Sequence, residues 1–182
     1  IRAAGVTASV SVDTYRAATA RAALGLGACM VNDISALRLD PGLAGVVADA
    51  QCDYVLMHMQ GDPKTMQAAP QYGDVVDDIR RFFEERLACA VGCGIREDRI
   101  WLDPGFGFGK TVEHNLTILR RLGEFRSLGR PILVGTSNKG TIGAVLGTVI
   151  GDRLEGTAAT VAVAIAHGAS CVRVHNVKAM AR

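Results

Sequence analysis

Short apolar runs alternate with amphipathic segments along the whole chain. The apolar runs predict strands at residues 8–12, 29–31, 54–57, 99–102, 132–135 and 171–174, the first of them rich in β-branched residues. Between the third and fourth runs, apolar side chains recur with the period of a helix. They are Val76, Ile79, Phe83, Leu87 and Ala90. This alternation predicts a parallel α/β fold, either an open doubly wound sheet or a (β/α)8 barrel.

The length of the chain bears on the choice between these two folds. A complete barrel takes about 250 residues, whereas this chain has 182. The chain starts at Ile1, close to the first predicted strand, and stops at Arg182, where another helix would begin. A barrel would therefore lack about two βα units, and we expect both ends of the chain to be cut.

Composition narrows the class of protein. Apolar residues make up 49% of the chain and aromatic residues 5%, which favours buried parallel strands under Ala-rich helices over a β-sandwich. The net charge is +2 and no basic run is interleaved with aromatic residues, so a nucleic-acid partner is not expected. We see no signal peptide and no membrane-spanning segment. The five cysteines lie in apolar stretches without zinc-like spacing, which predicts reduced core thiols in a cytosolic protein.

Every predicted strand ends in a polar or charged side chain. These are Asp13, Asn32, His58, Asp103, Lys139, and Arg173 with His175. Ligands of parallel α/β folds bind beyond the carboxyl ends of the strands. The two acids and the amide suit a nitrogen-rich heterocycle, because carboxylates accept hydrogen bonds and an amide both donates and accepts. The basic residues suit an anion such as a phosphate. The pattern predicts a heterocycle that carries a phosphate ester.

Several of these residues have a purely structural interpretation as well. Asp13 is equally expected as a helix cap, and Asn32 with Asp33 as an Asx-type turn. His58 follows an apolar strand and is expected to be a buried core histidine. Lysines 64 and 110 are expected to be solvated.

Among these candidates, Asp103 is the one for which a purely structural role is hardest to argue. Pro104, which follows it, has no N–H, and the glycines beyond leave the backbone free to approach a ligand. The same run ends in Gly109-Lys110-Thr111 but has Pro104 where a nucleotide-binding P-loop needs its first glycine. A P-loop nucleotide hydrolase is therefore not expected.

Five motifs, in chain order, resemble those of the dihydropteroate synthases, which are folate-pathway enzymes with a pterin-binding (β/α)8 barrel. They are Ser11–Thr14, Val31–Ile34, His58–Gln67, Asp103–Lys110 and Arg173–Val177. The resemblance covers essentially the whole chain. It implies one partial pterin-binding domain over residues 1–182, about the C-terminal two-thirds of the complete domain. Barrel strands 3 to 8 would be present and the first two βα units missing, so that the chain alone would be inactive or nearly so.

The resemblance also implies a reaction and its residues. A cytoplasmic transferase of folate biosynthesis would join (7,8-dihydropterin-6-yl)methyl diphosphate to 4-aminobenzoate, giving 7,8-dihydropteroate and diphosphate. The implied catalytic residues are Asp103, Lys139, Arg173 and His175. The implied pterin contacts are Asp13, Asn32, Asp103 and Lys139, the diphosphate contacts are Arg173 and His175, Phe108 walls the aminobenzoate site, and Val174 is a further binding residue.

A cofactor and a partner follow from the same resemblance. Mg²⁺ would accompany the diphosphate, but the asparagine associated with it lies in the missing N-terminal loop, so no metal ligand is expected here. The complete protein would be a homodimer.

One departure from the family pattern leaves alternatives open. After the fifth predicted strand the chain reads Ser137-Asn138-Lys139-Gly140, where the family usually has Ser-Arg-Lys-Ser. The lost serine lies where the family contacts the aminobenzoate carboxylate, so binding of aminobenzoate and of sulfonamides is expected to differ. Asn138 and Gly140 are the support for one alternative, a non-catalytic pterin-binding homologue. The other alternative is a pterin-dependent methyltransferase, which passes a methyl group from methyltetrahydrofolate to a corrinoid. Lys139 and the Arg173–His175 pair argue against the methyltransferase, because its reaction has no diphosphate.

Overall fold

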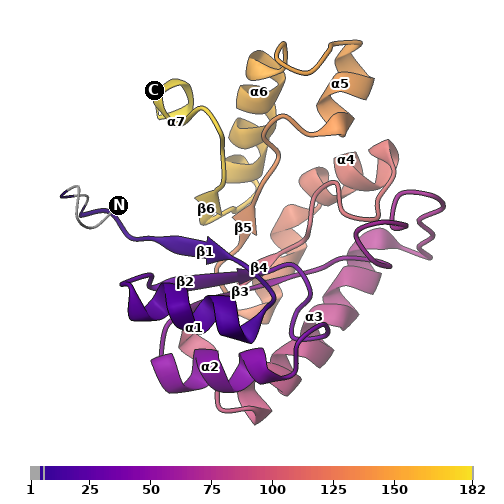
Figure 1. Ribbon diagram of the computed structural model, residues 1–182. Helices are drawn as coiled ribbons and strands as arrows, with labels where there is room; N and C mark the ends of the chain where they lie inside the picture. Colours follow the sequence, from indigo (N-terminus) through magenta and orange to yellow (C-terminus); the bar gives the residue numbers. More distant parts are fainter. Residues whose placement is uncertain (1–4, 6, 182) are drawn as a thin grey trace. The chain divides into compact units, whose positions relative to one another are not determined.

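The computed structural model describes residue 5 and residues 7–181 (Figure 1). The described residues form two compact units. The first holds the residues up to Met57 together with Phe83–Leu102, and the second holds His58–Phe82 together with the residues from Asp103 onward. That the chain forms one domain over residues 1–182 stays a prediction.

The first unit is built on a parallel sheet (Figure 1). Its strands are β1 (Ser11–Asp13), β2 (Met30–Asp33), β3 (Asp53–Met57) and β4 (Ile100–Asp103), in the order β1-β2-β3-β4. β1 pairs with β2, and β2 with β3, in parallel. The side chains from Tyr54 to Met57 are fully buried, as expected for a strand covered on both faces. The predicted α/β fold with parallel strands is confirmed.

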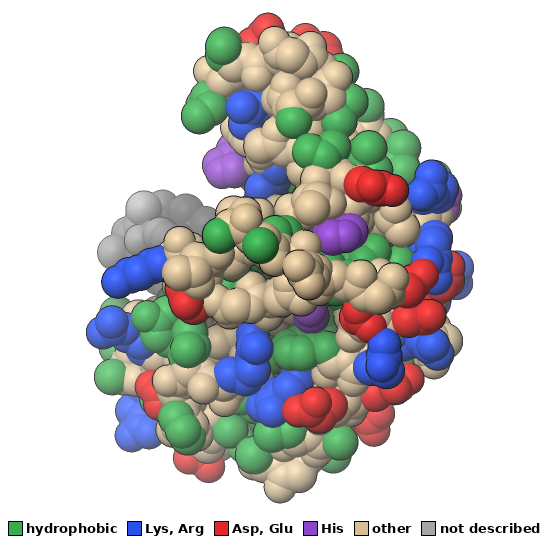
Figure 2. Space-filling model, turned by 90° about the vertical axis from the view of Figure 1, so that its right-hand side faces the viewer, with side chains coloured by type: hydrophobic (Ala, Val, Ile, Leu, Met, Phe, Trp, Pro, Cys, Tyr) green, Lys and Arg blue, Asp and Glu red, His purple; other side chains and the backbone are tan. Residues whose placement is uncertain are grey.

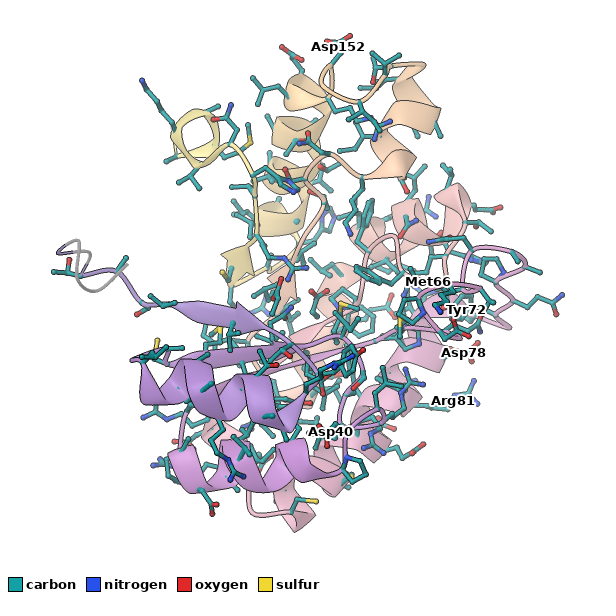
Figure 3. All side chains as sticks on the ribbon, viewed as in Figure 1. Asp40, Met66, Tyr72, Asp78, Arg81 and Asp152 are labelled. Atoms are coloured by element: carbon teal, nitrogen blue, oxygen red, sulfur yellow. The ribbon has the colours of Figure 1, made fainter. Side chains whose placement is uncertain are left out.

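Two helices cover one face of this sheet, α1 (Ala17–Gly25) and α2 (Gly42–Ala50) (Figure 1). A single carboxylate, that of Asp40, serves the first turn of both helices (Figure 3). Its Oδ2 accepts the N–H of Ala17 at 2.8 Å, and its Oδ1 accepts the N–H of Gly42 at 3.0 Å. Asp40 therefore satisfies the first N–H of α1, whose N-cap residue is Arg16 rather than Asp13.

A long helix, α3 (Val75–Gly92), belongs to both units in turn, because the boundary falls between Phe82 and Phe83. Its predicted apolar face is buried at Val76, Ile79, Phe83 and Ala90. The 3.6-residue period was therefore a reliable signal for this helix.

The second unit pairs two short parallel strands, β5 (Leu133–Val134) and β6 (Cys171–Val172). Its helices are α4 (Val112–Arg120), α5 (Gly140–Leu146), α6 (Leu154–Ala166) and α7 (Val177–Met180). Both strands are shorter than predicted, and α5 was not predicted at all. The short strands end before the residues that carry the candidate chemistry, which therefore lie on loops.

The surface carries charges of both signs. On the face shown in Figure 2, basic and acidic side chains are interspersed. No helix among the described residues is long and apolar enough to cross a membrane. All five cysteines are free thiols, but Cys93 and Cys171 are exposed. The prediction of core thiols is wrong for these two, because Cys93 lies just beyond the end of α3 and Cys171 is the first residue of β6.

Candidate functional site

The second unit holds a buried acid at the tip of β4. Asp103 is 1% exposed, and its Oδ1 accepts the N–H of Gly105 at 2.7 Å. Its Oδ2 lies 4.0 Å from Nη2 of Arg173. Burial raises the pKa of Asp103, while the Gly105 bond and the charges of Arg173, Lys110 and Lys139 act in the opposite direction. A carboxylate in such a place can accept further hydrogen bonds from a polar ligand.

The loop that follows Asp103 passes very close to the residues after β3. A Cβ on Gly105 would lie 1.9 Å from the carbonyl oxygen of His58, and one on Gly109 would lie 2.6 Å from that of Gln60. Both glycines also have positive φ, +67° and +62°. Only glycine fits at these positions. The two segments are further joined by the hydroxyl of Tyr72 (labelled in Figure 3). This hydroxyl donates to the carbonyl of Gly109 at 2.7 Å.

Lys110 is buried, contrary to the expectation that it is solvated. Its side chain is 4% exposed. Its Nζ lies 2.9 Å from Nδ1 of His58 and donates to the carbonyl of Phe108 at 3.0 Å. Burial lowers the pKa of Lys110 to about 7. Lys64 is exposed and His58 is buried, as predicted. No local pattern distinguishes the two lysines, because the burial of Lys110 depends on contacts with residues far away in the sequence.

Lys139 lies beside an aromatic ring and an open cavity. Its Nζ is 4.3 Å from the centroid of the Phe108 ring, a cation–π distance. Burial, and secondarily the charge of Arg173, lower the pKa of Lys139. The cavity has a volume of about 450 Å³, large enough for a small aromatic ligand. Its lining includes Gly107, Asn115, Lys139, Gly140 and Thr141.

The three residues after β6 are placed by β5 and the loop after it. The backbone N–H of Arg173 donates to the carbonyl of Val134 at 2.9 Å. A Cβ on Gly135 would lie 3.3 Å from Nε of Arg173, so the guanidinium lies along that glycine. His175 is exposed, and its Nδ1 lies 2.9 Å from Oγ of Ser137. Val174 is half-buried. The structure thus brings Arg173 close to Asp103, and His175 close to a serine that sequence reasoning did not single out.

Asp13 and Asn32 lie side by side in the first unit, as paired positions of β1 and β2. Asp13 is exposed. Asn32 is 2% exposed, and neither its Nδ2 nor its Oδ1 has a hydrogen-bond partner among the described residues. A buried amide without partners is uncommon and calls for a ligand or another explanation. The next residue, Asp33, accounts for the predicted turn, because it accepts the N–H groups of Ser35 and Leu37 at 2.7 Å each.

The candidate residues do not suit a resident metal ion. Among the described residues, no group of three or more His, Cys, Asp or Glu side chains could hold one. The only acid near Arg173 that the described contacts identify is Asp103, and the other charged neighbours of Asp103 are Lys110 and Lys139. A predominantly cationic set favours an anion over a divalent cation.

Comparison with known proteins points to one family. The profile of the family described as pterin binding enzyme matches residues 1–175. A dihydropteroate synthase of Synechocystis is 47% identical over 174 residues, which cover 95% of this chain and 60% of that protein. The chain therefore spans only about 60% of the length of this curated relative.

Solved structures show the same likeness. A dihydropteroate synthase from Stenotrophomonas maltophilia, with imidazole bound in its active site, superposes with a TM-score of 0.94 at 40% identity, over 98% of this chain and 68% of that one. One from Xanthomonas albilineans, in complex with 7,8-dihydropteroate, gives 0.91 at 40% identity, over 98% and 65%. The predicted resemblance and the barrel class of fold are confirmed, whereas the numbering of the barrel strands is not tested.

Proposed function

This chain belongs to the family of pterin-binding enzymes, and we propose that the protein containing it is a dihydropteroate synthase. The reaction would join the methylene carbon of a dihydropterin to the amino nitrogen of 4-aminobenzoate, with loss of diphosphate. The observation that carries the proposal is the buried amide of Asn32, whose donor and acceptor both lack partners among the described residues. A pterin ring offers adjacent N–H and ring nitrogen groups that match such an amide.

The proposed substrate contacts are the residues that the family resemblance implies. Asp13 and Asn32 of the first unit are proposed pterin contacts. Asp103 and Lys139 of the second unit are proposed pterin contacts as well. Arg173 and His175, also of the second unit, are the proposed diphosphate contacts. Phe108 and Val174 complete the set as an aminobenzoate wall and a further binding residue. The support is the geometry of each group, most directly the burial of Asp103 beside the Arg173 guanidinium.

The proposed chemistry follows from the charges of these groups. The C–O bond to the diphosphate breaks first, and the leaving group departs with the electron pair. Positive charge then develops on the pterin methylene, where a buried carboxylate such as Asp103 is stabilising. Arg173 and His175 stabilise the departing anion. The amine attacks the methylene carbon and releases a proton as the C–N bond forms. Phe108 would form a wall of the aminobenzoate site, which we assign to the cavity lined by Gly107 and Gly140.

The finer points of the prediction belong to the same proposal. The strands present would be barrel strands 3 to 8, and the active protein would be a cytoplasmic homodimer. Mg²⁺ would accompany the diphosphate, but the described residues do not fit a metal site. We therefore assign no step of the reaction to the metal.

The test compares two Asp→Asn variants of the complete gene product. Asp103→Asn keeps the size of the side chain and an acceptor for Gly105 but removes the charge. We expect the rate of dihydropteroate formation to fall about 100-fold, the usual loss for a group that stabilises transition-state charge. Asp152→Asn, at an exposed acid in the loop before α6 (Figure 3), is the matched control and should leave the rate unchanged.

Three outcomes would contradict the proposal. Equal rates for Asp103→Asn and Asp152→Asn would remove Asp103 from the reaction. Saturable binding of methyltetrahydrofolate, without binding of the pterin diphosphate, would point instead to a pterin-dependent methyltransferase. Pterin binding without any aminobenzoate binding in the presence of diphosphate would indicate a non-catalytic homologue.

A further inference from the structure

The buried contact between Lys110 and His58 has no part in the reaction described above. We propose that Lys110 and His58 are positioning residues, which fix the loop that carries Phe108 next to the aminobenzoate cavity. The inference rests on the proposed function only for the identity of the substrate. The contact itself, and the order it gives the loop, are properties of the protein without substrate.

The amino group of Lys110 joins two segments of the second unit. It donates to the carbonyl of Phe108 within its own loop, at 3.0 Å, and it lies 2.9 Å from Nδ1 of His58, the first residue after β3. The backbone N–H of His58 in turn donates to the carbonyl of Asp103 at 2.9 Å. Residues 103–110 are thus tied to His58 at both ends, once through the backbone and once through the lysine side chain.

The surroundings of His58 make it a fixed attachment point. Its ring packs edge-on against Phe82, with centroids 4.8 Å apart, and lies 6.0 Å from the ring of Tyr72. The carbonyl of His58 faces Gly105 so closely that no Cβ could be accommodated there. A side chain held between two aromatic rings and a backbone contact has little freedom to move. Lys110 therefore binds to a rigid partner.

The hydrogen-bonding capacity of Lys110 fits this role in either protonation state. The groups that face it are the imidazole of His58, the carboxylate of Asp103 and the amine of Lys139. A charged amine has three N–H groups, and a neutral amine still has two, one for each of its contacts. The loop can therefore stay attached when the lysine loses its proton. A methionine at this position would fill the same space and offer no donor.

The consequence concerns Phe108, whose carbonyl is the second acceptor. Its ring lies under Nζ of Lys139, and both Lys110 and Lys139 line the cavity proposed for the aromatic acid. When the Lys110 amine is removed, the Phe108 carbonyl loses its donor and the ring loses its fixed place. Binding of the aromatic acid should weaken more than binding of the pterin.

The test uses Lys110→Met, with Lys178→Met on the exposed part of α7 as the matched control. The first readout is amide hydrogen exchange of the complete gene product without substrate. We expect faster exchange confined to residues 105–110 in Lys110→Met and no change in Lys178→Met. Faster exchange throughout the second unit would overturn the inference, because it would show a general structural role. Unchanged exchange of residues 105–110 would overturn it as well.

The second readout separates the two substrates. For Lys110→Met we expect KM for 4-aminobenzoate to rise about tenfold, with KM for the pterin diphosphate changed by less than about twofold. His58→Asn keeps an acceptor where Nδ1 lies, so its KM for 4-aminobenzoate should stay close to the wild-type value. His58→Leu has no acceptor there and should behave like Lys110→Met. Equal KM values for His58→Asn and His58→Leu would contradict the role of the hydrogen bond. If the wild-type protein forms no dihydropteroate, the proposed function fails, while the exchange result still decides whether the loop is held by Lys110.

Discussion

The substitution Asn32→Leu tests whether the first unit keeps a place for a polar ligand. Leucine has nearly the shape of asparagine and no polar atom. Each buried polar group without a partner costs roughly 1–3 kcal/mol of folding free energy, and Asn32 has two such groups among the described residues. Asn32→Leu should therefore raise the free energy of unfolding by about 2 kcal/mol. At the same time it should weaken pterin binding about 100-fold, since two hydrogen bonds to the ligand are lost.

The chain offers a matched control in Asn115, which is 1% exposed against 2% for Asn32. The amide of Asn115 is fully bonded. Its Oδ1 accepts the N–H of Gly107 at 2.8 Å, and its Nδ2 donates to the carbonyl of Thr111 at 2.8 Å and to Oγ1 of Thr141 at 2.9 Å. Asn115→Leu leaves these three groups without their partner. It should lower the free energy of unfolding by about 3 kcal/mol.

Urea denaturation of the complete gene product, followed by circular dichroism, measures both changes, and calorimetry measures pterin binding. The account predicts opposite signs for the two asparagines. If Asn32→Leu destabilises the protein as much as Asn115→Leu does, the Asn32 amide is satisfied within the protein and the reasoning is refuted. If Asn32→Leu stabilises the protein but leaves pterin binding intact, the amide lacks a partner for a reason unrelated to the pterin.

Three further predictions concern the second unit. Gly105→Ala should lower the free energy of unfolding by about 3 kcal/mol, because the added Cβ would lie 1.9 Å from the His58 carbonyl oxygen. Gly129 is the control, since it has the same φ of +67° and an added Cβ there would meet no atom within 4 Å. In urea denaturation Gly129→Ala should lose only about 1 kcal/mol, and equal losses for the two variants would exclude the close approach as the cause. Gly140→Ser should tighten 4-aminobenzoate binding severalfold in calorimetry, since it restores the family's serine at a position with open space for a Cβ; unchanged affinity would show that this residue does not contact the substrate. Burial lowers the pKa of Lys110 to about 7, so between about pH 7 and 10 the folded protein binds fewer protons than the unfolded chain. The free energy of unfolding should therefore rise with pH over that window, by up to about 5 kcal/mol. The rise should be absent in Lys110→Met, and an identical pH profile for both proteins would contradict the lowered pKa.

The sheet of the first unit was predictable because its strands are short apolar runs, and β3 is buried on both faces. Residues 54–57 were predicted as a strand, and β3 begins only one residue earlier. The helix α3 was predictable for a similar reason, since its period of apolar residues is long and regular. In both cases the signal is local and arises from burial of one continuous set of side chains.

Elements that depend on distant contacts were missed. α5 begins with glycine and contains a second one at Gly143, so the sequence of Gly140–Leu146 has a low intrinsic helix propensity. Its formation depends on packing, since Thr141 is held by Asn115 of α4. The same holds for Lys110, whose burial needs His58, 52 positions earlier. A composition rule that places lysine in solvent cannot include such a contact.

Some features of the candidate site were predictable from local sequence, and others depend on packing. The strand-end rule selected Asp103, Lys139 and Arg173 from sequence, and the structure brings these charges close enough to affect one another. The rule could not show that Asn32 is buried without a partner, or that Ser137 holds His175, because both facts depend on the packing of neighbouring segments. Sequence therefore indicated the chemistry, while the structure supplied the arguments for individual roles.

The most direct test of the central claim is a stoichiometric assay of the complete gene product with both proposed substrates. The protein is incubated with the dihydropterin methyl diphosphate and 4-aminobenzoate, and the two products are quantified together. The account predicts one 7,8-dihydropteroate for each diphosphate released, with formation of dihydropteroate dependent on both substrates. Absence of dihydropteroate from a folded protein that binds the pterin diphosphate would contradict the account.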